Sequence, residues 1–199
     1  HIRGEQMNLN NIPEALKILN QWVCTRGDSK VPMRASMNCA ASSTDSSTWS
    51  TFDMARNSVE RGYNDYVGFV FNDNGIVGID IDDGYDEDGF ISPLAADIIG
   101  KCKTYTEKSK SGRGFHILLY GNLPFKGKNN LKGVEIYKSS RYFIMTGETL
   151  LYNNIEENQE AIDYIVEKYF PETRECESNH TLTNRIYTPI WVKAEGKIG

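Results

Sequence analysis

Two aspartates separated by one residue, Asp80 and Asp82, stand at the end of an apolar run with the sequence GIDID at 78–82. Side chains alternate between the two faces of a strand, so both carboxylates are expected on one face, with Ile79 and Ile81 in the core. Carboxylates this close repel each other and both stay ionised only when a cation lies between them. Their hard oxygens suit Mg²⁺ or Mn²⁺. The pair therefore indicates a metal site; the alternative is a solvated strand end, because further acids follow at once.

A glycine-rich turn with the sequence SKSGRGFH occupies residues 109–116. The backbone N–H groups of such a turn can converge on an anion, and the Ser111 hydroxyl adds a donor. Arg113 offers charge-assisted, bidentate contacts to phosphate. His116 opens the next strand, where its ring can reach the same anion. The turn predicts phosphate binding; the alternative is an ordinary hairpin turn with an incidental histidine.

Two further charged residues lie in the strand-like runs that follow. Glu135 stands between Val134 and Ile136 in a basic neighbourhood, where its carboxylate can complete a three-acid metal site. Arg141 opens an apolar run, and an arginine entering a buried strand needs a carboxylate or a substrate phosphate as its partner. Phosphoryl transfer requires this combination of acids that hold two cations and donors that clamp a triphosphate.

The elements that must position these residues follow from apolar spacing and turn signals. Helices are predicted at 13–21, 52–61, 93–102 and 155–169. Strands are predicted at 22–24, 67–71, 75–82, 115–120, 134–137 and 142–146. The sequence NDNG at 72–75 predicts a hairpin between the second and third of these strands. The order indicates an α+β protein with a mainly antiparallel sheet backed by helices, and with the charged residues on successive strands of that one sheet.

The 199 residues suffice for one α/β domain or for two small lobes that share a core. We expect a catalytic domain at 10–170, a tag remnant or disordered N-terminus at 1–9, and a tail or linker at 171–199. Four scattered cysteines without CxxC spacing argue against zinc and against a disulfide framework. No apolar run approaches the roughly 20 residues of a membrane span, so the expected location is cytoplasmic, without a membrane partner.

The net charge of −5 is unevenly distributed along the chain. Between Lys101 and Arg141, ten basic residues are opposed by only two acids, Glu107 and Glu135. Many such stretches are only solvated surfaces. This one contains the glycine-rich turn and an isolated acid, and it therefore favours binding of a polyanion.

Together the motifs resemble those of the archaeo-eukaryotic primase superfamily, in particular the primase-polymerase (PrimPol) domains of phage, plasmid and mobile-element replication proteins. The residues that carry the resemblance are GIDID at 78–82, YTEKSKSGRGFH at 105–116 and GVEIYKSSRYFIMTG at 133–147, with weaker support from 21–23, 30–32 and 41–49. The chain departs from the pattern at Lys110, where such domains commonly have proline.

The resemblance implies an RRM-like catalytic core with a smaller N-terminal α/β unit. It implies Asp80, Asp82 and Glu135 as catalytic ligands of Mg²⁺ or Mn²⁺. The residues expected at the nucleotide are Ser111, Gly112, Arg113, Gly114, His116, Arg141 and Tyr142. Of these, His116 also counts as catalytic, and Tyr142 is the candidate for sensing the 2′ position of the sugar.

The implied function is template-directed synthesis or extension of primers on single-stranded DNA from NTPs or dNTPs, in the replication of a mobile element. A helicase domain or subunit is a candidate partner, because relatives often continue into a helicase region. A metal-dependent nuclease would use the same acids but would leave the triphosphate clamp without a purpose. A non-catalytic module could bind single strands through Tyr137, Tyr142 and Phe143, although the aligned acids would then repel the phosphates.

Overall fold

The computed structural model describes residues 7–171, so most of the expected tail lies outside the described residues. The chain divides into two compact units, the first ending at Ile162 and the second beginning at Asp163. The site described below belongs to the first unit. The helical segments of the first unit are η1 (Leu9–Asn11), α1 (Glu14–Lys17), η2 (Ser46–Thr48), α2 (Phe52–Glu60) and α3 (Pro93–Cys102). A further helix, α4 (Gln159–Tyr169), includes the point at which the two units divide.

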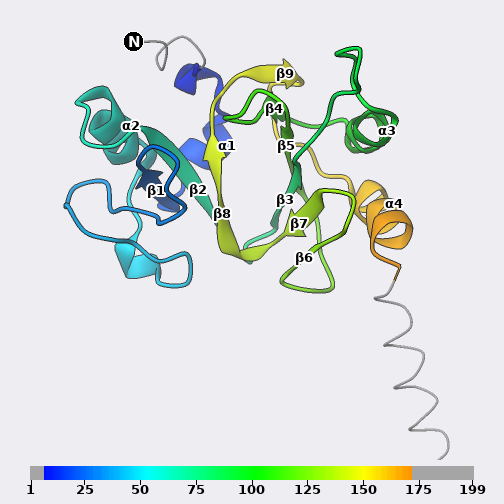
Figure 1. The fold of residues 1–199 in the computed structure, drawn as a ribbon. Helices are drawn as coiled ribbons and strands as arrows, with labels where there is room; N and C mark the ends of the chain where they lie inside the picture. Colours follow the sequence, from blue (N-terminus) through cyan, green and yellow to red (C-terminus); the bar gives the residue numbers. More distant parts are fainter. Residues whose placement is uncertain (1–6, 172–199) are drawn as a thin grey trace, which may run out of the picture. The chain divides into compact units, whose positions relative to one another are not determined.

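The strands form two antiparallel sheets (Figure 1). The smaller sheet has the order β1 (Trp22–Thr25), β2 (Tyr66–Asn72), β8 (Ser139–Met145). The larger sheet has the order β6 (Gly127–Asn129), β7 (Val134–Tyr137), β3 (Ile76–Ile81), β5 (Phe115–Tyr120), β4 (Thr106–Lys108), β9 (Thr149–Leu151). Antiparallel sheets with separate helices confirm the predicted α+β class.

The predicted hairpin between β2 and β3 is wrong. The two strands follow one another closely, but β2 pairs with β1 and β8, whereas β3 pairs with β5 and β7. Asp73 and Gly75 have the positive φ values of a tight turn, 53° and 90°. That turn carries the chain from one sheet into the other, and the Asp73 N–H donates to the Lys138 carbonyl at 2.7 Å. The sequence NDNG predicts the turn correctly, but it does not determine which partner each strand takes.

The same division corrects the expectation of a single sheet for all the charged residues. Asp80, His116 and Glu135 lie on β3, β5 and β7 of the larger sheet. Arg141 and Tyr142 lie on β8, in the smaller sheet. The candidate site therefore draws its residues from two sheets.

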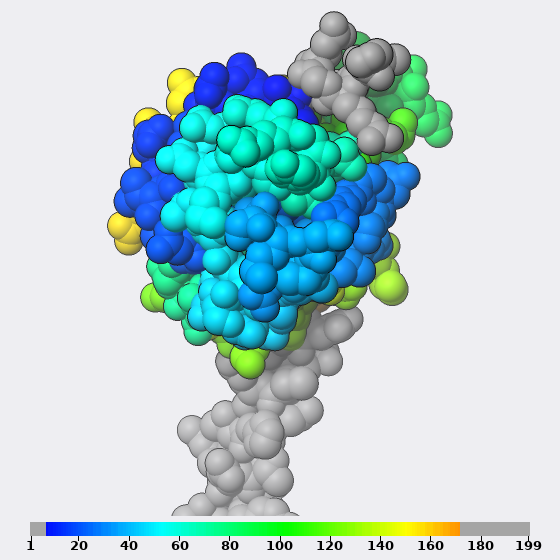
Figure 2. Space-filling view, turned by 90° about the vertical axis from the view of Figure 1, so that its left-hand side faces the viewer, coloured from blue at the N-terminus to red at the C-terminus, as the bar shows by residue number. Residues whose placement is uncertain are grey.

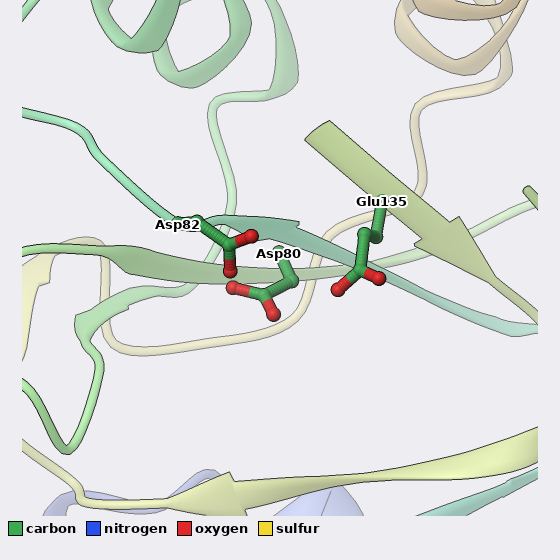
Figure 3. A group of neighbouring side chains, drawn as sticks. All are labelled: Asp80, Asp82 and Glu135. Carbon is green, nitrogen blue, oxygen red and sulfur yellow. The ribbon is translucent and has the colours of Figure 1, made fainter. Parts of the chain in front are cut away.

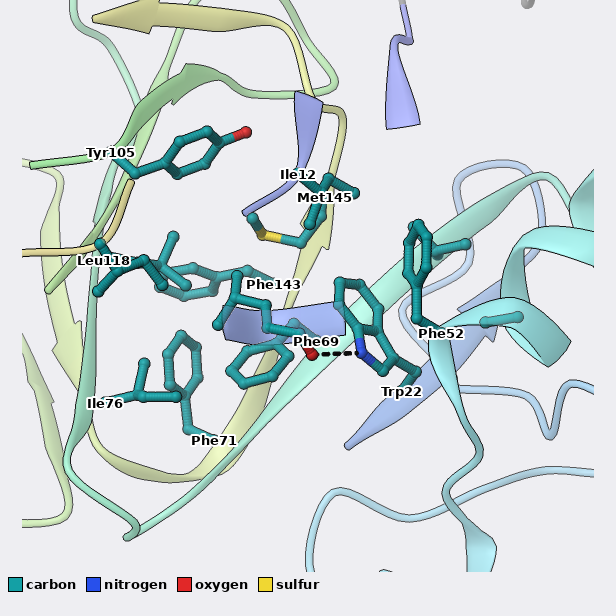
Figure 4. Close-up of a cluster of buried hydrophobic side chains, with 14 of the residues drawn as sticks. Ile12, Trp22, Phe52, Phe69, Phe71, Ile76, Tyr105, Leu118, Phe143 and Met145 are labelled. Atoms are coloured by element: carbon teal, nitrogen blue, oxygen red, sulfur yellow. Dashed lines mark hydrogen bonds between the residues drawn. The ribbon is translucent and has the colours of Figure 1, made fainter. Parts of the chain in front are cut away.

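An aromatic core lies between the sheets (Figure 4). Phe71 of β2 meets Phe69 and Phe143 edge to face, with ring centroids 5.5 and 4.7 Å apart, an arrangement that aromatic pairs favour. Gly78 of β3 allows this approach, because a Cβ atom there would lie 2.2 Å from Cζ of Phe71. Trp22 extends the cluster, and its indole N–H donates to the Leu16 carbonyl at 3.0 Å.

The helices follow their sequence signals to different degrees. α2 and α3 form as predicted, and the hydroxyls of Thr51 and Ser92 cap them by accepting N–H bonds from the first turn. The helix predicted at 13–21 is shortened to α1, because Gln21 already bonds to the backbone of Val70. Within the described residues, no helix has the length and apolar character that crossing a bilayer requires.

Candidate metal and phosphate site

Three carboxylates come together at the C-terminal end of β3, an inner strand of the larger sheet (Figure 3). Asp80 lies opposite Glu135 in the β3–β7 register, and Asp82 follows directly after β3. The strand alternation is as predicted, because Ile79 and Ile81 are buried on the other face. One oxygen from each acid lies within 4.8 Å of the others. These are the three acids that the sequence assigned to a metal.

Backbone contacts fix the position of this end of β3. The Asp82 N–H donates to the Gly133 carbonyl at 3.0 Å, which ties the end of β3 to the residue before β7. Gly114 lies against the same strand end, where an added Cβ would lie 2.4 Å from the Ile81 carbonyl oxygen. The glycine at 114 therefore permits close packing of the loop on β3.

The electrostatics of the acids favour a bound cation. The pKa of Asp80 is raised to about 6, mainly by burial and also by the neighbouring charges of Asp82 and Glu135, against an opposing effect of His116. Burial and Glu135 also raise the pKa of Asp82. A divalent cation would offset this cost, and a donor set made only of carboxylate oxygens fits Mg²⁺ or Mn²⁺.

His116 stands beside the acids, opposite Asp80 in the β3–β5 register. Its Nε2 lies 3.6 Å from Oδ1 of Asp80, and its Nδ1 lies 3.3 Å from Oε1 of Glu107 on β4. Burial acts to lower the pKa of His116, but the hydrogen bond to Glu107 and the charges of both acids outweigh it and raise the pKa. The ring stacks on Phe143 of the other sheet, with centroids 4.7 Å apart.

A cleft of about 720 Å³ opens over these residues. The larger sheet contributes the three acids and His116, and β8 contributes 140–144. The remaining walls come from the loop at 109–111 and from the N-terminal segment at Lys30, Pro32 and Ser43. Acids therefore lie on one side of the cleft, and basic and hydroxyl side chains lie on the others.

A second hollow, of about 860 Å³, lies between α2 and residues 35–38. Figure 2 shows the side of the molecule on which α2 and the segment between β1 and α2 gather. The hollow is lined by neutral side chains together with Arg26 and Arg61, and none of the three acids reaches it.

A known protein is similar to this chain over most of the chain's own length. Over 144 residues, 68% of the chain, it is 34% identical to a DNA primase-polymerase of Nitratiruptor phage NrS-1. The chain carries a primase-polymerase domain. It spans about one fifth (20%) of the length of the phage protein. No family model matches the chain.

The glycine-rich loop of the primase-polymerase domain differs from a simple anion cradle. The N–H groups of Gly112, Arg113 and Gly114 are taken up inside the loop, by the Ser109 carbonyl and by the Ser111 and Ser109 hydroxyls respectively. The loop faces the cleft with residues 109–111, so its side chains rather than these three N–H groups are placed to meet a ligand.

The two arginines expected at the nucleotide, Arg141 and Arg113, lie in different places. Arg141 lines the cleft, with its guanidinium 5.0 Å above the ring of Tyr137. The Tyr137 hydroxyl in turn donates to Glu135 at 3.1 Å. Arg113 is not among the residues lining the cleft, and its exposed guanidinium pairs with Asp83 at 3.1 Å.

Lys110, where similar domains have proline, fastens the loop to the N-terminal segment. Its ammonium donates to the Gly27 carbonyl, lies 3.2 Å from Asp28, and sits 4.4 Å above the ring of Tyr66. Tyr142 makes a parallel connection, because its hydroxyl donates to the Lys30 carbonyl at 2.7 Å.

Sequence reasoning did not select Lys30 or Glu107 as site residues. The ammonium of Lys30 has no ion pair with an acid of residues 7–171, but its charge acts to lower the pKa of Asp82. The only signal for it was the weak motif at 30–32, inside a polar segment without periodicity. Glu107 lies in a three-residue strand too short to show alternation.

Proposed function

We propose that the domain is a metal-dependent nucleotidyltransferase that synthesises or extends primers on single-stranded DNA from NTPs or dNTPs. The observation that carries the proposal is the cluster of Asp80, Asp82 and Glu135 on one face of a cleft whose other walls bear Lys30 and Arg141. The name of the phage relative supports the reaction class.

Asp80, Asp82 and Glu135 would hold Mg²⁺ or Mn²⁺. The bound metal would polarise the phosphoryl oxygens and stabilise the charge that develops as the primer hydroxyl attacks. The acids would also hold the reacting groups at one end of the cleft, because Asp80 and Glu135 project from paired strands and Asp82 follows directly after β3.

The triphosphate would lie between the acids and the basic wall. We assign it to Arg141, His116 and Ser111, with Lys30 as an additional cation. In this arrangement Gly112 and Gly114 shape the loop, and Arg113 would have to leave Asp83 to reach a phosphate. Tyr142 lines the same cleft and is the proposed contact for the sugar.

The primase fold with an RRM-like core, a mobile-element setting, an intracellular location and a helicase partner belong to the same proposal. They rest on the motif resemblance and on the phage origin of the relative.

The direct test is to incubate the chain with single-stranded DNA, Mg²⁺ or Mn²⁺, and labelled NTPs or dNTPs, and to resolve the products by length. Labelled products that grow with time, and that disappear in the Asp80→Ala variant, are expected. Shortened DNA would indicate a nuclease. Binding without any change in length would indicate a non-catalytic module.

A further inference from the structure

Glu107 is an acid buried in the larger sheet, and its side chain has 0% exposure. Acidic side chains are almost never buried to this degree unless they are paired. Here four donors surround the carboxylate. Oε1 accepts the Thr146 N–H at 3.0 Å and faces His116 Nδ1 at 3.3 Å, and Oε2 accepts the Gly147 N–H at 2.9 Å and the Tyr105 hydroxyl at 2.7 Å. An ionised carboxylate offers acceptors only, which matches this set of donors.

The register places Glu107 in one row with the candidate metal site. Glu107 lies opposite His116, and His116 lies opposite Asp80, which lies opposite Glu135. The row crosses β4, β5, β3 and β7 on a single face of the sheet. His116 therefore stands between the buried acid and the metal-binding acids, and Phe143 covers its ring.

The two nitrogens of His116 have different surroundings as a result. The hydrogen bond made by one ring nitrogen sets the role of the other. Nδ1 faces Glu107 in the interior, and a carboxylate acceptor there requires that Nδ1 carry a proton. Nε2 faces Asp80 and the cleft.

We propose that Glu107 is a positioning residue that holds His116 with Nε2 directed at the triphosphate of the incoming nucleotide. The same carboxylate fastens the N–H groups of Thr146 and Gly147, directly after β8. Because β8 carries Arg141, one buried acid fixes the positions of both the histidine and the strand of the arginine. This inference rests on the proposed function.

A double-mutant cycle separates positioning from a merely structural role. Glu107→Gln should lower kcat/KM for the nucleotide by roughly ten- to a hundredfold, the loss that is typical when the partner orienting a metal-ligating histidine is replaced. In a His116→Ala background the same change should have a clearly smaller effect, because the route through the histidine is gone and only the bonds to Thr146 and Gly147 remain. The loss of thermal stability from Glu107→Gln should persist in the His116→Ala background, because the bonds from Thr146, Gly147 and Tyr105 are altered in both.

Tyr105→Phe is the matched control. It removes one donor to Glu107 but leaves the histidine contact in place, so it should lower the melting temperature without changing kcat/KM. An equal fold-loss from Glu107→Gln in both backgrounds would overturn the proposal, since it would show that Glu107 acts independently of His116.

A second measurement needs no variant of Glu107 and no catalysis. In the ¹⁵N spectrum of the histidine-labelled wild-type chain, with the signal assigned through His116→Ala, we expect Nδ1 of His116 to be protonated. An unprotonated Nδ1 would refute the positioning. If the wild-type chain makes no labelled product, the proposed function fails, and this spectrum still tests the contact.

Discussion

At the scale of single residues, the metal-binding acids combine function with a cost in stability. Asp80 is raised to a pKa of about 6 from an ordinary value of 3.8, mainly by burial. A carboxyl with a raised pKa stabilises the folded state while it is protonated. That stabilisation is complete below about pH 4 and is lost as the pH rises through about 6. At neutral pH the ionised Asp80 therefore lowers the free energy of unfolding of the ion-free protein.

Replacing Asp80 by asparagine should abolish nucleotide incorporation and make the ion-free protein more stable at pH 7.5. One pKa unit corresponds to about 1.4 kcal/mol, so the gain in the free energy of unfolding should be on the order of 1–3 kcal/mol. It should shrink towards pH 4. Urea unfolding in the presence of a chelator measures it. Asp83→Asn, which alters an exposed acid next to the pair, is the control, and an equal gain from that variant would contradict the explanation.

The two arginines allow a matched comparison. Arg141 faces the cleft, whereas Arg113 pairs with Asp83 outside it. A hydrogen bond to a charged group is worth about 1.5–3 kcal/mol, so Arg141→Ala should weaken nucleotide use by roughly ten- to a hundredfold for all four bases. Arg113→Ala should have a much smaller effect, and affinity for single-stranded DNA should change little in either. Titrations of nucleotide and of DNA distinguish these outcomes. A larger loss from Arg113→Ala would reverse the assignment.

At the scale of elements, loops from distant parts of the sequence close the cleft. Lys110 joins the glycine-rich loop to residues 27–28 and to Tyr66, and Tyr142 joins β8 to Lys30. These contacts place Lys30 opposite the acids. The loops are thus positioned by each other as well as by the sheets.

Lys110→Met should loosen this connection and raise the KM for the nucleotide several-fold. Its ion pair with the exposed Asp28 contributes little. The contacts with Gly27 and the Tyr66 ring carry the effect, and a cation over an aromatic ring contributes about 0.5–2 kcal/mol. Asp28→Asn should therefore change neither KM nor melting temperature, and comparing both quantities in the two variants tests the point. An effect of Asp28→Asn as large as that of Lys110→Met would instead identify the ion pair as the important contact.

Strands were predictable where local pattern decides the structure, and the partners of the strands were not. β5 and β7 have the predicted bounds, because their apolar residues form short, clearly bounded runs. The turn signal favours a hairpin between β2 and β3, since pairing across 74 residues of sequence, as between Phe69 and Phe143, leaves no local signal. The acids at 80, 82 and 135 were found through residue type and spacing. Glu107 was not, because its donors at 146 and 147 lie about 40 residues away.

At the scale of the whole molecule, charge is concentrated in one part of the sequence. The chain has a net charge of −5, yet the stretch from Lys101 to Arg141 is strongly basic. Several of its lysines lie at β6 and its flanks, and the residue before β7 bonds to Asp82. A nucleic acid bound at the cleft would meet positive charge there and negative charge elsewhere.

Affinity for single-stranded DNA should therefore fall steeply with salt, because each neutralised phosphate releases counterions. Charge reversal at Lys126 and Lys128 should weaken DNA binding and reduce the slope of log affinity against log salt, without changing nucleotide affinity. Arg56→Glu, on α2 and outside the basic stretch, is the control. Fluorescence anisotropy at several salt concentrations measures all three proteins. A salt-independent affinity would rule out this mode of binding.

Gly78 has a consequence for the redesign of this domain. It carries no functional group, yet a methyl group at its Cα would meet the rings of Phe71 at 2.2 Å and Phe143 at 2.6 Å. Those rings pack between the sheet that bears the acids and the strand that bears Arg141. The packing of these interior residues therefore sets the distance between the acidic and basic walls of the cleft. An engineer who wishes to admit a bulkier nucleotide can vary residues 71 and 78 together, and leave every side chain that lines the cleft unchanged.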